Sequence, residues 1–200
     1  MEKLGFQKED WTAKITLRPY QVSDLDDFLE WANDNEVIRT SRLRHFTSRE
    51  DALTYLKEVA IPDPWYKAVC LEGRPVGFVL FSQIGPGSAR CRGTLSVALG
   101  RKYWGKGIIT TALNMLVSAV LEEFPDVERV EAFTLVDNKA MQRVLAKLGF
   151  QKEGKLRKYL VIHGKVSDVF MYSLLRSEYL PRPASSTVSN VPLLELEGDS

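Results

Sequence analysis

The chain has 200 residues, of which 44% are hydrophobic and 26% are charged. Its formal net charge is only +1, so no overall field attracts the protein to nucleic acid or to a membrane surface, and we expect neither partner. The N-terminus lacks an apolar signal core, and no apolar run is long enough to span a membrane. These features predict a cytoplasmic protein.

Cysteine and histidine are scarce in this sequence. Cys70 and Cys91 are the only cysteines, and both lie in strand-like runs, which favours buried or neutral thiols over a disulfide or metal ligands. His45 and His163 are the only histidines, and neither has a metal-ligand spacing to a cysteine. The sequence therefore predicts no metal site.

The hydrophobic pattern predicts one domain over residues 12–180, preceded by a short arm at 1–11 and followed by a flexible tail at 181–200. Strands and helices mix irregularly, which predicts an α+β fold. In chain order, we expect a strand at 15–19, a helix at 25–32, an irregular basic segment at 35–46, a helix at 52–59, a hairpin of strands at 65–72 and 75–84, a strand at 89–99, a helix at 112–121, a strand at 130–136, a helix at 139–148, a strand starting at 150, and strands at 156–162 and 166–175.

The most informative segment joins the strand at 89–99 to the following helix. Residues 102–107 read Lys-Tyr-Trp-Gly-Lys-Gly. Gly105 and Gly107 allow the backbone to approach a ligand closely, and the free N–H groups of the helix start favour an anion. Lys102 and Lys106 add positive charge. The segment predicts a pyrophosphate cradle, but it matches neither the P-loop nor the dinucleotide motif, so ATP and NAD are not the expected ligands.

A second strand, polar junction and helix follow at residues 130–148. Asn138 stands where its side chain caps the helix, and Gly149 is placed as a C-terminal cap. Asn138-Lys139-Ala140-Met141, followed by Lys147-Leu148-Gly149-Phe150, resembles the second motif of the GNAT superfamily of acetyl-CoA-dependent N-acetyltransferases. Residues 102–107 resemble that family's phosphate loop, with Lys102 in place of Gln or Arg. The sequences of residues 103–108 and 153–157 resemble those of the RimJ/RimL branch of the family, which acetylates protein N-terminal amines.

This resemblance implies a mixed central sheet, flanked by helices and splayed apart between its fourth and fifth strands, with CoA in the split. It implies acetyl-CoA as co-substrate and direct attack by the amine in a ternary complex. The strand before the loop would offer backbone groups to the pantetheine arm and the thioester oxygen. The residues expected to bind the cofactor are Leu95, Val97, Ala98, Lys102, Tyr103, Trp104, Gly105, Lys106, Gly107, Ile108, Asn138 and Met141.

The groups that move protons are harder to assign. Many members of the family place a tyrosine where this chain has Leu145, and a carboxylate on the fourth strand, where Thr94 and Ser96 stand. Ser96, Glu131 and Tyr172 are therefore the catalytic candidates, with His163 and Asp168 also available. A base that acts through water remains an equal alternative.

The basic segment at residues 39–46 lies where family members shape the acceptor pocket, and it is either a solvated loop or part of that pocket. Basic residues there favour an acidic or polar acceptor over a cationic one. The preferred function is acetylation of a protein or peptide α-amine. A small-molecule amine acetyltransferase and a non-catalytic CoA-binding module remain alternatives, and we expect a monomer or a homodimer.

Overall fold

The structure is a computed structural model that describes residues 11–179. The expected tail at 181–200, and the expected arm except for Trp11, lie outside the described residues.

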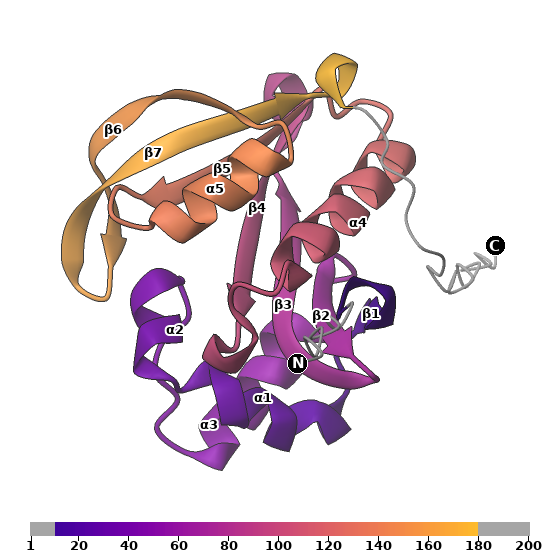
Figure 1. Cartoon of the computed structure of the whole chain (residues 1–200), viewed down its shortest axis with the longest axis vertical. Coiled ribbons are helices and arrows are strands. Elements are labelled where there is room, and N and C mark those ends of the chain that lie inside the picture. The colour runs from indigo at the N-terminus through magenta and orange to yellow at the C-terminus, as the bar shows by residue number, and fades with distance from the viewer. Residues whose placement is uncertain (1–10, 180–200) are drawn as a thin grey trace, which may run out of the picture.

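One seven-stranded sheet has the order β1-β2-β3-β4-β5-β7-β6, with helices on both faces (Figure 1). The strands are β1 (Ile15–Pro19), β2 (Tyr66–Leu71), β3 (Arg74–Gln83), β4 (Arg92–Leu99), β5 (Arg129–Leu135), β6 (Gln151–Ile162) and β7 (Lys165–Leu175), and the helices are α1 (Leu25–Ala32), α2 (Asn35–Thr40), α3 (Arg49–Tyr55), α4 (Ile108–Glu123) and α5 (Lys139–Lys147).

The sheet is split between β4 and β5, which are its parallel neighbours. Their pairing is confined to residues 92–95 of β4 and 129–132 of β5. Beyond that point the strands diverge, and β5, β6 and β7 fan away from β4 in Figure 1. The mixed sheet, splayed between the fourth and fifth strands, is therefore confirmed.

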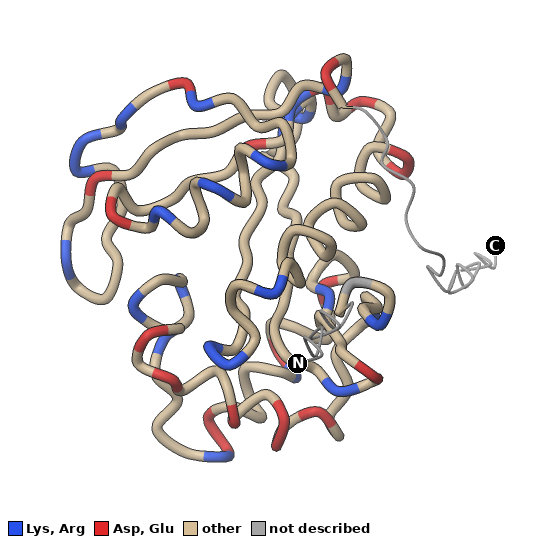
Figure 2. Tube along the Cα trace, viewed as in Figure 1, with Lys and Arg blue, Asp and Glu red and all other residues tan. Residues whose placement is uncertain are grey.

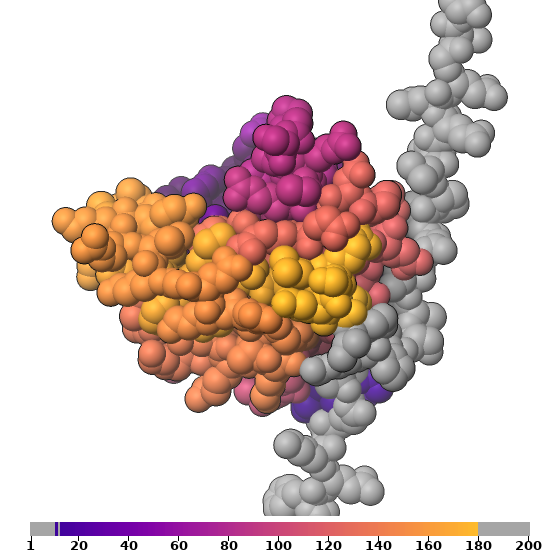
Figure 3. Space-filling view, turned by 90° about the horizontal axis from the view of Figure 1, so that it is seen from above, coloured from indigo at the N-terminus to yellow at the C-terminus, as the bar shows by residue number. Residues whose placement is uncertain are grey.

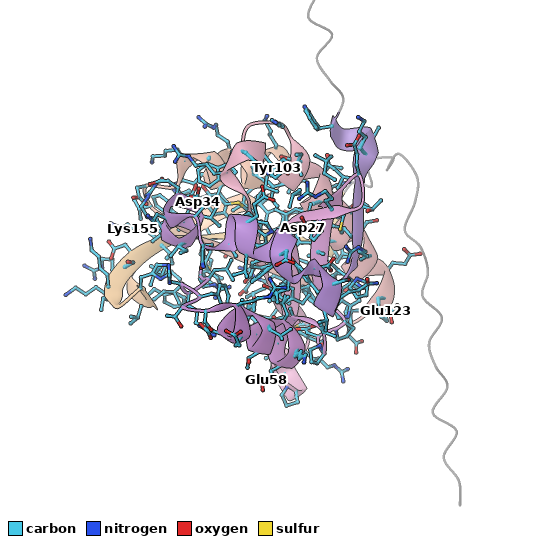
Figure 4. All side chains as sticks on the ribbon, turned by 90° about the horizontal axis from the view of Figure 1, so that it is seen from below. Asp27, Asp34, Glu58, Tyr103, Glu123 and Lys155 are labelled. Carbon is cyan, nitrogen blue, oxygen red and sulfur yellow. The ribbon has the colours of Figure 1, made fainter. Side chains whose placement is uncertain are left out.

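Two hydrophobic layers cover opposite faces of the sheet. On β2, Val69 and Leu71 pack into the layer that contains α4, whereas Ala68 and Cys70 pack into the layer built by α1, α2 and α3. This follows from the alternation of side chains along a strand, which gives a central strand two buried faces. Seen from below, α1 and the start of α2 lie across the second layer, where Asp27 and Asp34 mark them (Figure 4).

The segment at residues 35–46, expected to be irregular, begins with a helix. Asp34 caps α2, because its Oδ1 atom accepts hydrogen bonds from the N–H groups of Glu36 and Val37 at 2.8 and 3.2 Å. This cap satisfies donors that a short helix otherwise leaves open, and burial of Val37 anchors the turn. Only residues 41–46 are irregular as expected.

The strand expected at residues 89–99 starts later, at Arg92. A 3₁₀ turn at Gly87–Ala89 precedes it, because the left-handed backbone of Gly87 turns the chain before pairing can begin. Cys91 is consequently exposed and lies outside the strand in which it was expected, and it is a free thiol. Cys70 is buried, and burial raises the pKa of its thiol to about 11.

The C-terminal hairpin contains one long strand where two were expected. β6 runs without a break over residues 151–162, because shifts in its register against β7 absorb the irregular residues. At the second shift, Lys158 has a φ of 50°, and its N–H group donates to Asp168 at 2.8 Å. Asp168 also binds Lys155 at 2.7 Å, so its carboxylate stabilises the bulge.

Candidate active site

A cavity of about 920 Å³ passes through the split between β4 and β5. On one face it is lined by the loop before α4 and by α5, and on the other by α2, β2, β3 and the segment after α2. The paired ends of β4 and β5 lie at one end of the split. There the magenta atoms of the β3–β4 loop border the salmon atoms of the segment between α4 and β5 in Figure 3. The cavity therefore connects the two layers of the molecule through the sheet.

The glycine loop forms one wall of the cavity. A 3₁₀ turn at residues 101–103 leads into it, and Gly105 and Gly107 have φ values of 75° and 81°. This left-handed region favours glycine, which explains both residues. Gly107 precedes α4, whose first N–H groups have no partner within the helix. Both glycines and Ile108 line the cavity, so the loop presents backbone donors to an anion.

The edge of β4 offers a second set of backbone groups. Gly100 donates its N–H group to Val76 at 2.8 Å, and backbone groups alternate in direction along a strand. Ser96 pairs with Leu80 and Ala98 with Phe78, so the N–H and C=O groups of Ser96 and Ala98 point toward β3. Those of Val97 point into the split. Ala98 enters the site through its contact with the cavity.

The groups of Leu95 and the carbonyl of Leu99, on either side of Val97, are already engaged. Leu95 is paired with Ala132 of β5. The carbonyl of Leu99 accepts a hydrogen bond from the indole N–H of Trp104 at 2.7 Å. This bond also attaches the glycine loop to β4. The backbone of β4 is therefore open to a ligand at Val97, and the N–H group of Leu99 faces the same way.

Asn138 and α5 line the same side of the cavity. The Oδ1 atom of Asn138 caps α5 by accepting from the N–H group of Met141, as the sequence predicts. Met141 and the basic residues Arg143 and Lys147 line the cavity beyond it. Basic positions recur along α5 in Figure 2. This wall suits an anionic ligand that runs from the glycine loop along α5.

The two lysines of the loop point elsewhere. Lys102 forms an ion pair with Glu30, which raises its pKa, and Lys106 lies over the ring of Trp11, 4.4 Å from its centroid. Neither side chain is part of the cavity lining, whereas Tyr103 and Trp104 are. The loop therefore faces the cavity with its backbone and its aromatic side chains and not with its lysines.

Two of the three catalytic candidates lie outside the cavity lining. Glu131 is 2% exposed and is neutralised by the side chains of Arg129 and Arg92, at 2.8 and 3.5 Å. Tyr172 is buried in the α4 layer, and burial raises its pKa. Ser96 does line the cavity, and its Oγ atom accepts a hydrogen bond from the Nη2 atom of Arg42.

His163 lies at the turn between β6 and β7, against the end of α2. Its Nε2 atom is 2.8 Å from the carbonyl oxygen of Ile38 and 3.3 Å from that of Ser41. The ring thus joins the hairpin to the segment that carries Arg42, and it is not part of the cavity lining. Asp168, engaged in the β6 bulge, is likewise outside it.

Two cavity residues were missed by the sequence analysis. The hydroxyl groups of Tyr55 and Tyr66 are 2.9 Å apart, and both side chains line the side of the cavity that α2, β2 and β3 form. Burial raises the pKa of each phenol, so both stay protonated at neutral pH. Tyr55 ends a helix and Tyr66 begins a strand eleven residues later. No sequence pattern predicts their contact, because only tertiary packing brings the two rings together.

Few of the side chains that line the cavity can accept or donate a proton near neutral pH. Among the residues that the structure describes, its lining contains no Asp, Glu or His, and its cationic side chains are those of Arg42, Arg143 and Lys147. Within residues 11–179 there is no cluster of potential metal ligands, nor a helix long and apolar enough to cross a membrane. The cavity therefore suits chemistry that depends on positioning rather than on a strong protein base.

Comparisons with known proteins agree with this geometry. A family model described as an acetyltransferase (GNAT) domain matches residues 14–151. The chain is 28% identical over 182 residues to p20, an uncharacterized N-acetyltransferase of Bacillus licheniformis, a match that covers 84% of this chain and 97% of p20. It is 30% identical over 106 residues to the ribosomal protein uS5-alanine N-acetyltransferase of Escherichia coli (strain K12), covering 53% of this chain and 54% of that enzyme. Its fold resembles that of Mycobacterium smegmatis RimJ in complex with CoA-disulfide, with a TM-score of 0.72 at 21% identity and coverage of 87% and 88%.

Proposed function

Because the chain belongs to the GNAT family of acetyl-CoA-dependent N-acetyltransferases, we propose that it acetylates the α-amine of a protein or peptide. The observation that carries this proposal is the absence of Asp, Glu and His from the described lining of the cavity. An α-amine has a pKa of about 7.7–8.0, against about 10.4 for a lysine side chain. A substantial fraction of the α-amine is therefore neutral near pH 7.5, and water suffices to take its proton.

The residues described above fit acetyl-CoA, which supplies the activated acetyl group. Gly105 and Gly107 present backbone N–H groups to the pyrophosphate, and a Cβ atom added at Gly105 would meet no protein atom within 4 Å. The amide of Asn138 and the open backbone groups of Val97 serve the pantetheine arm. Val97 is also placed to donate its N–H group to oxyanion charge as the amine attacks. The acetyl group then passes to nitrogen as the CoA thiolate leaves.

The name of the Escherichia coli relative, which specifies an alanine of ribosomal protein uS5, supports a protein acceptor. Such an acceptor would place the reaction in the cytoplasm. The match spans only about half of that enzyme, so the same chemistry on a small-molecule amine is the second candidate. The basic residue Arg42 at the acceptor side speaks against polyamines in that case. We propose a monomer or a homodimer as the active form.

The test is a matched pair of peptides with identical sequence. One has its α-amine free and its lysine side chain blocked, and the other has a blocked α-amine and a free lysine. We expect faster turnover of acetyl-CoA with the α-amine peptide at pH 7.5, measured as CoA release together with the mass of the product. Faster turnover of the lysine peptide would overturn the preference. Binding of acetyl-CoA without turnover of any amine would favour a binding module.

A further inference from the structure

We propose that Arg42 is the acceptor's anion receptor: its guanidinium group binds a carboxylate that the acceptor carries close to the reactive amine. The inference deepens the proposed function by naming the acceptor's chemistry, and it rests on that function. Arg42 lines the cavity, and its Nη2 atom donates to the hydroxyl oxygen of Ser96. Ser96 immediately precedes Val97, where the backbone of β4 opens into the split. The guanidinium group of Arg42 therefore lies beside the part of β4 at which we propose that the acetyl group is transferred.

The backbone on both sides of Arg42 is fixed, although its side chain is exposed. Ser41 and Leu43 are only 8% and 3% exposed. The Ser41 hydroxyl accepts from the N–H group of Leu43 at 3.2 Å, and His163 contacts the Ser41 carbonyl. Ser96 holds the far end of the Arg42 side chain. A guanidinium group anchored at both ends is preorganised to receive a ligand, because less freedom is lost on binding.

The charge of Arg42 is unbalanced, unlike that of its neighbours in the same segment. Arg39 binds Glu36 at 2.8 Å, and Arg44 makes two hydrogen bonds to Asp51, at 2.7 and 2.6 Å. Within residues 11–179, Arg42 has no carboxylate partner, and its one hydrogen bond is to a neutral hydroxyl. Its remaining N–H groups are thus available to an incoming carboxylate, which a guanidinium can bind through two parallel hydrogen bonds.

The side chains around Arg42 favour an acceptor with a carboxylate over one with a second cation. The described lining offers no acidic group that would attract a second amine. Tyr55, Tyr66 and Phe78 form an aromatic wall on the same face as Ser96. An acceptor with a carboxylate on the residue that carries the amine, or on the next residue, satisfies both features. Two sources have this chemistry: a peptide with Asp or Glu next to its N-terminal residue, and a free amino acid.

The experiment measures kcat/KM for acetylation of matched acceptors by the full chain, with each value divided by the fraction of the acceptor amine that is neutral at the assay pH. The peptides Ser-Glu-Ala-Ala amide and Ser-Gln-Ala-Ala amide differ only in the second side chain, and serine with serinamide provides the corresponding free pair. We expect the wild-type protein to prefer the carboxylate member of at least one pair by about tenfold, the effect of a hydrogen bond to a charged group. The pair that shows the preference identifies the source.

Arg42→Gln should reduce that ratio to about one while the KM for acetyl-CoA stays unchanged. Arg44→Gln is the matched control, because it also removes one positive charge and lies two residues from Arg42. Unlike Arg42, Arg44 is already bound to Asp51. It should retain the wild-type ratio. A wild-type ratio of one in both pairs, or a ratio that survives Arg42→Gln, would overturn the assignment while leaving the acetyltransferase activity intact.

A binding measurement separates failure of this proposal from failure of the proposed function. Calorimetry with the CoA-saturated protein compares binding of Ser-Glu-Ala-Ala amide and serine with their neutral counterparts. Tighter binding of a carboxylate member by the wild-type protein, lost in Arg42→Gln, would support the receptor even if no acceptor were turned over. Equal binding by both proteins would count against it. A circular dichroism melt confirms that each variant is folded.

Discussion

The side-chain oxygen of Asn138 accepts a hydrogen bond from the backbone N–H group of Met141 at 3.0 Å, whereas its amide nitrogen bonds to no group within residues 11–179. The oxygen caps α5, and the nitrogen remains available to the ligand in the cavity that Asn138 lines. The helix cap and the proposed binding role of this side chain therefore use different atoms.

Substitution at this residue should separate the two functions. Asn138→Ser keeps an N-cap oxygen and removes the amide donor, so we expect a small change in melting temperature and a roughly tenfold loss of acetyl-CoA affinity. Asn138→Ala should show the same loss of affinity together with a loss of about 1 kcal/mol in stability. Calorimetry and thermal melts measure the two effects. Unchanged affinity in Asn138→Ser would remove the amide from the binding site.

The glycine loop can be tested against a matched glycine elsewhere. Gly105 and Gly73 have φ values of 75° and 84°, and a Cβ atom at either would meet no heavy atom within 4 Å. Alanine at each should therefore impose a similar backbone strain of about 1–2 kcal/mol. Only Gly105→Ala should weaken acetyl-CoA binding, by about tenfold or more, because only Gly105 lines the cavity. Equal affinities in the two variants would contradict the proposed cradle.

The pH dependence of acetylation should report the acceptor rather than the enzyme. Since the described lining lacks Asp, Glu and His, kcat/KM should rise with pH as the α-amine loses its proton, with a midpoint of about 8. A peptide that begins with β-alanine, whose amine is more basic, should shift this limb to higher pH. Tyr55→Phe should leave it in place, because the raised pKa of Tyr55 keeps the phenol protonated. A limb that moved with Tyr55→Phe and not with the acceptor would identify a base on the protein.

Glu153 should contribute an acid-sensitive part of the stability. Hydrogen bonds from Arg129 and Ser173 lower the pKa of its carboxyl group to about 2, below the usual value of about 4.3. A depressed folded-state pKa stabilises the fold above the unfolded-state pKa, and this contribution is lost as the pH falls through the folded-state value. The carboxylate is 40% exposed, so solvent screening limits the contribution to about 1 kcal/mol or less.

Thermal melts between pH 7 and pH 2.5 test this. The wild-type protein should lose stability as the pH falls below about 4.5, and Glu153→Gln should start less stable and lose less over that window. Exposed Glu58, on the π-helical turn at Leu56–Ala60, labelled in Figure 4, provides the control. Glu58→Gln should follow the wild-type curve. Parallel curves for the wild-type protein and Glu153→Gln would show that the ion pair contributes nothing measurable.

Local sequence determined most of the elements and the backbone of the glycine loop. The glycines of residues 102–107 predict a backbone that approaches an anion, and Asn138 predicts the start of α5. Both predictions rest on interactions within a few residues, which depend little on the rest of the fold. The boundaries of α2 and of the start of β4 differed from expectation. The start of α2 depends on the cap by Asp34, and the start of β4 depends on the turn at Gly87–Ala89. Hydrophobic periodicity reports neither feature.

Tertiary structure alone decided which groups face the cavity. Glu131 and Tyr172 occupy strands as expected, but the pairing of β5 with β7 and the arginines around Glu131 bury both away from the lining. Conversely, Arg42 meets Ser96 across 54 positions of sequence, and Tyr55 meets Tyr66 only through packing of α3 on β2. Such contacts depend on strand register and side-chain direction. A register shift of one residue would turn each side chain to the other face of the sheet, and only the assembled sheet fixes that register.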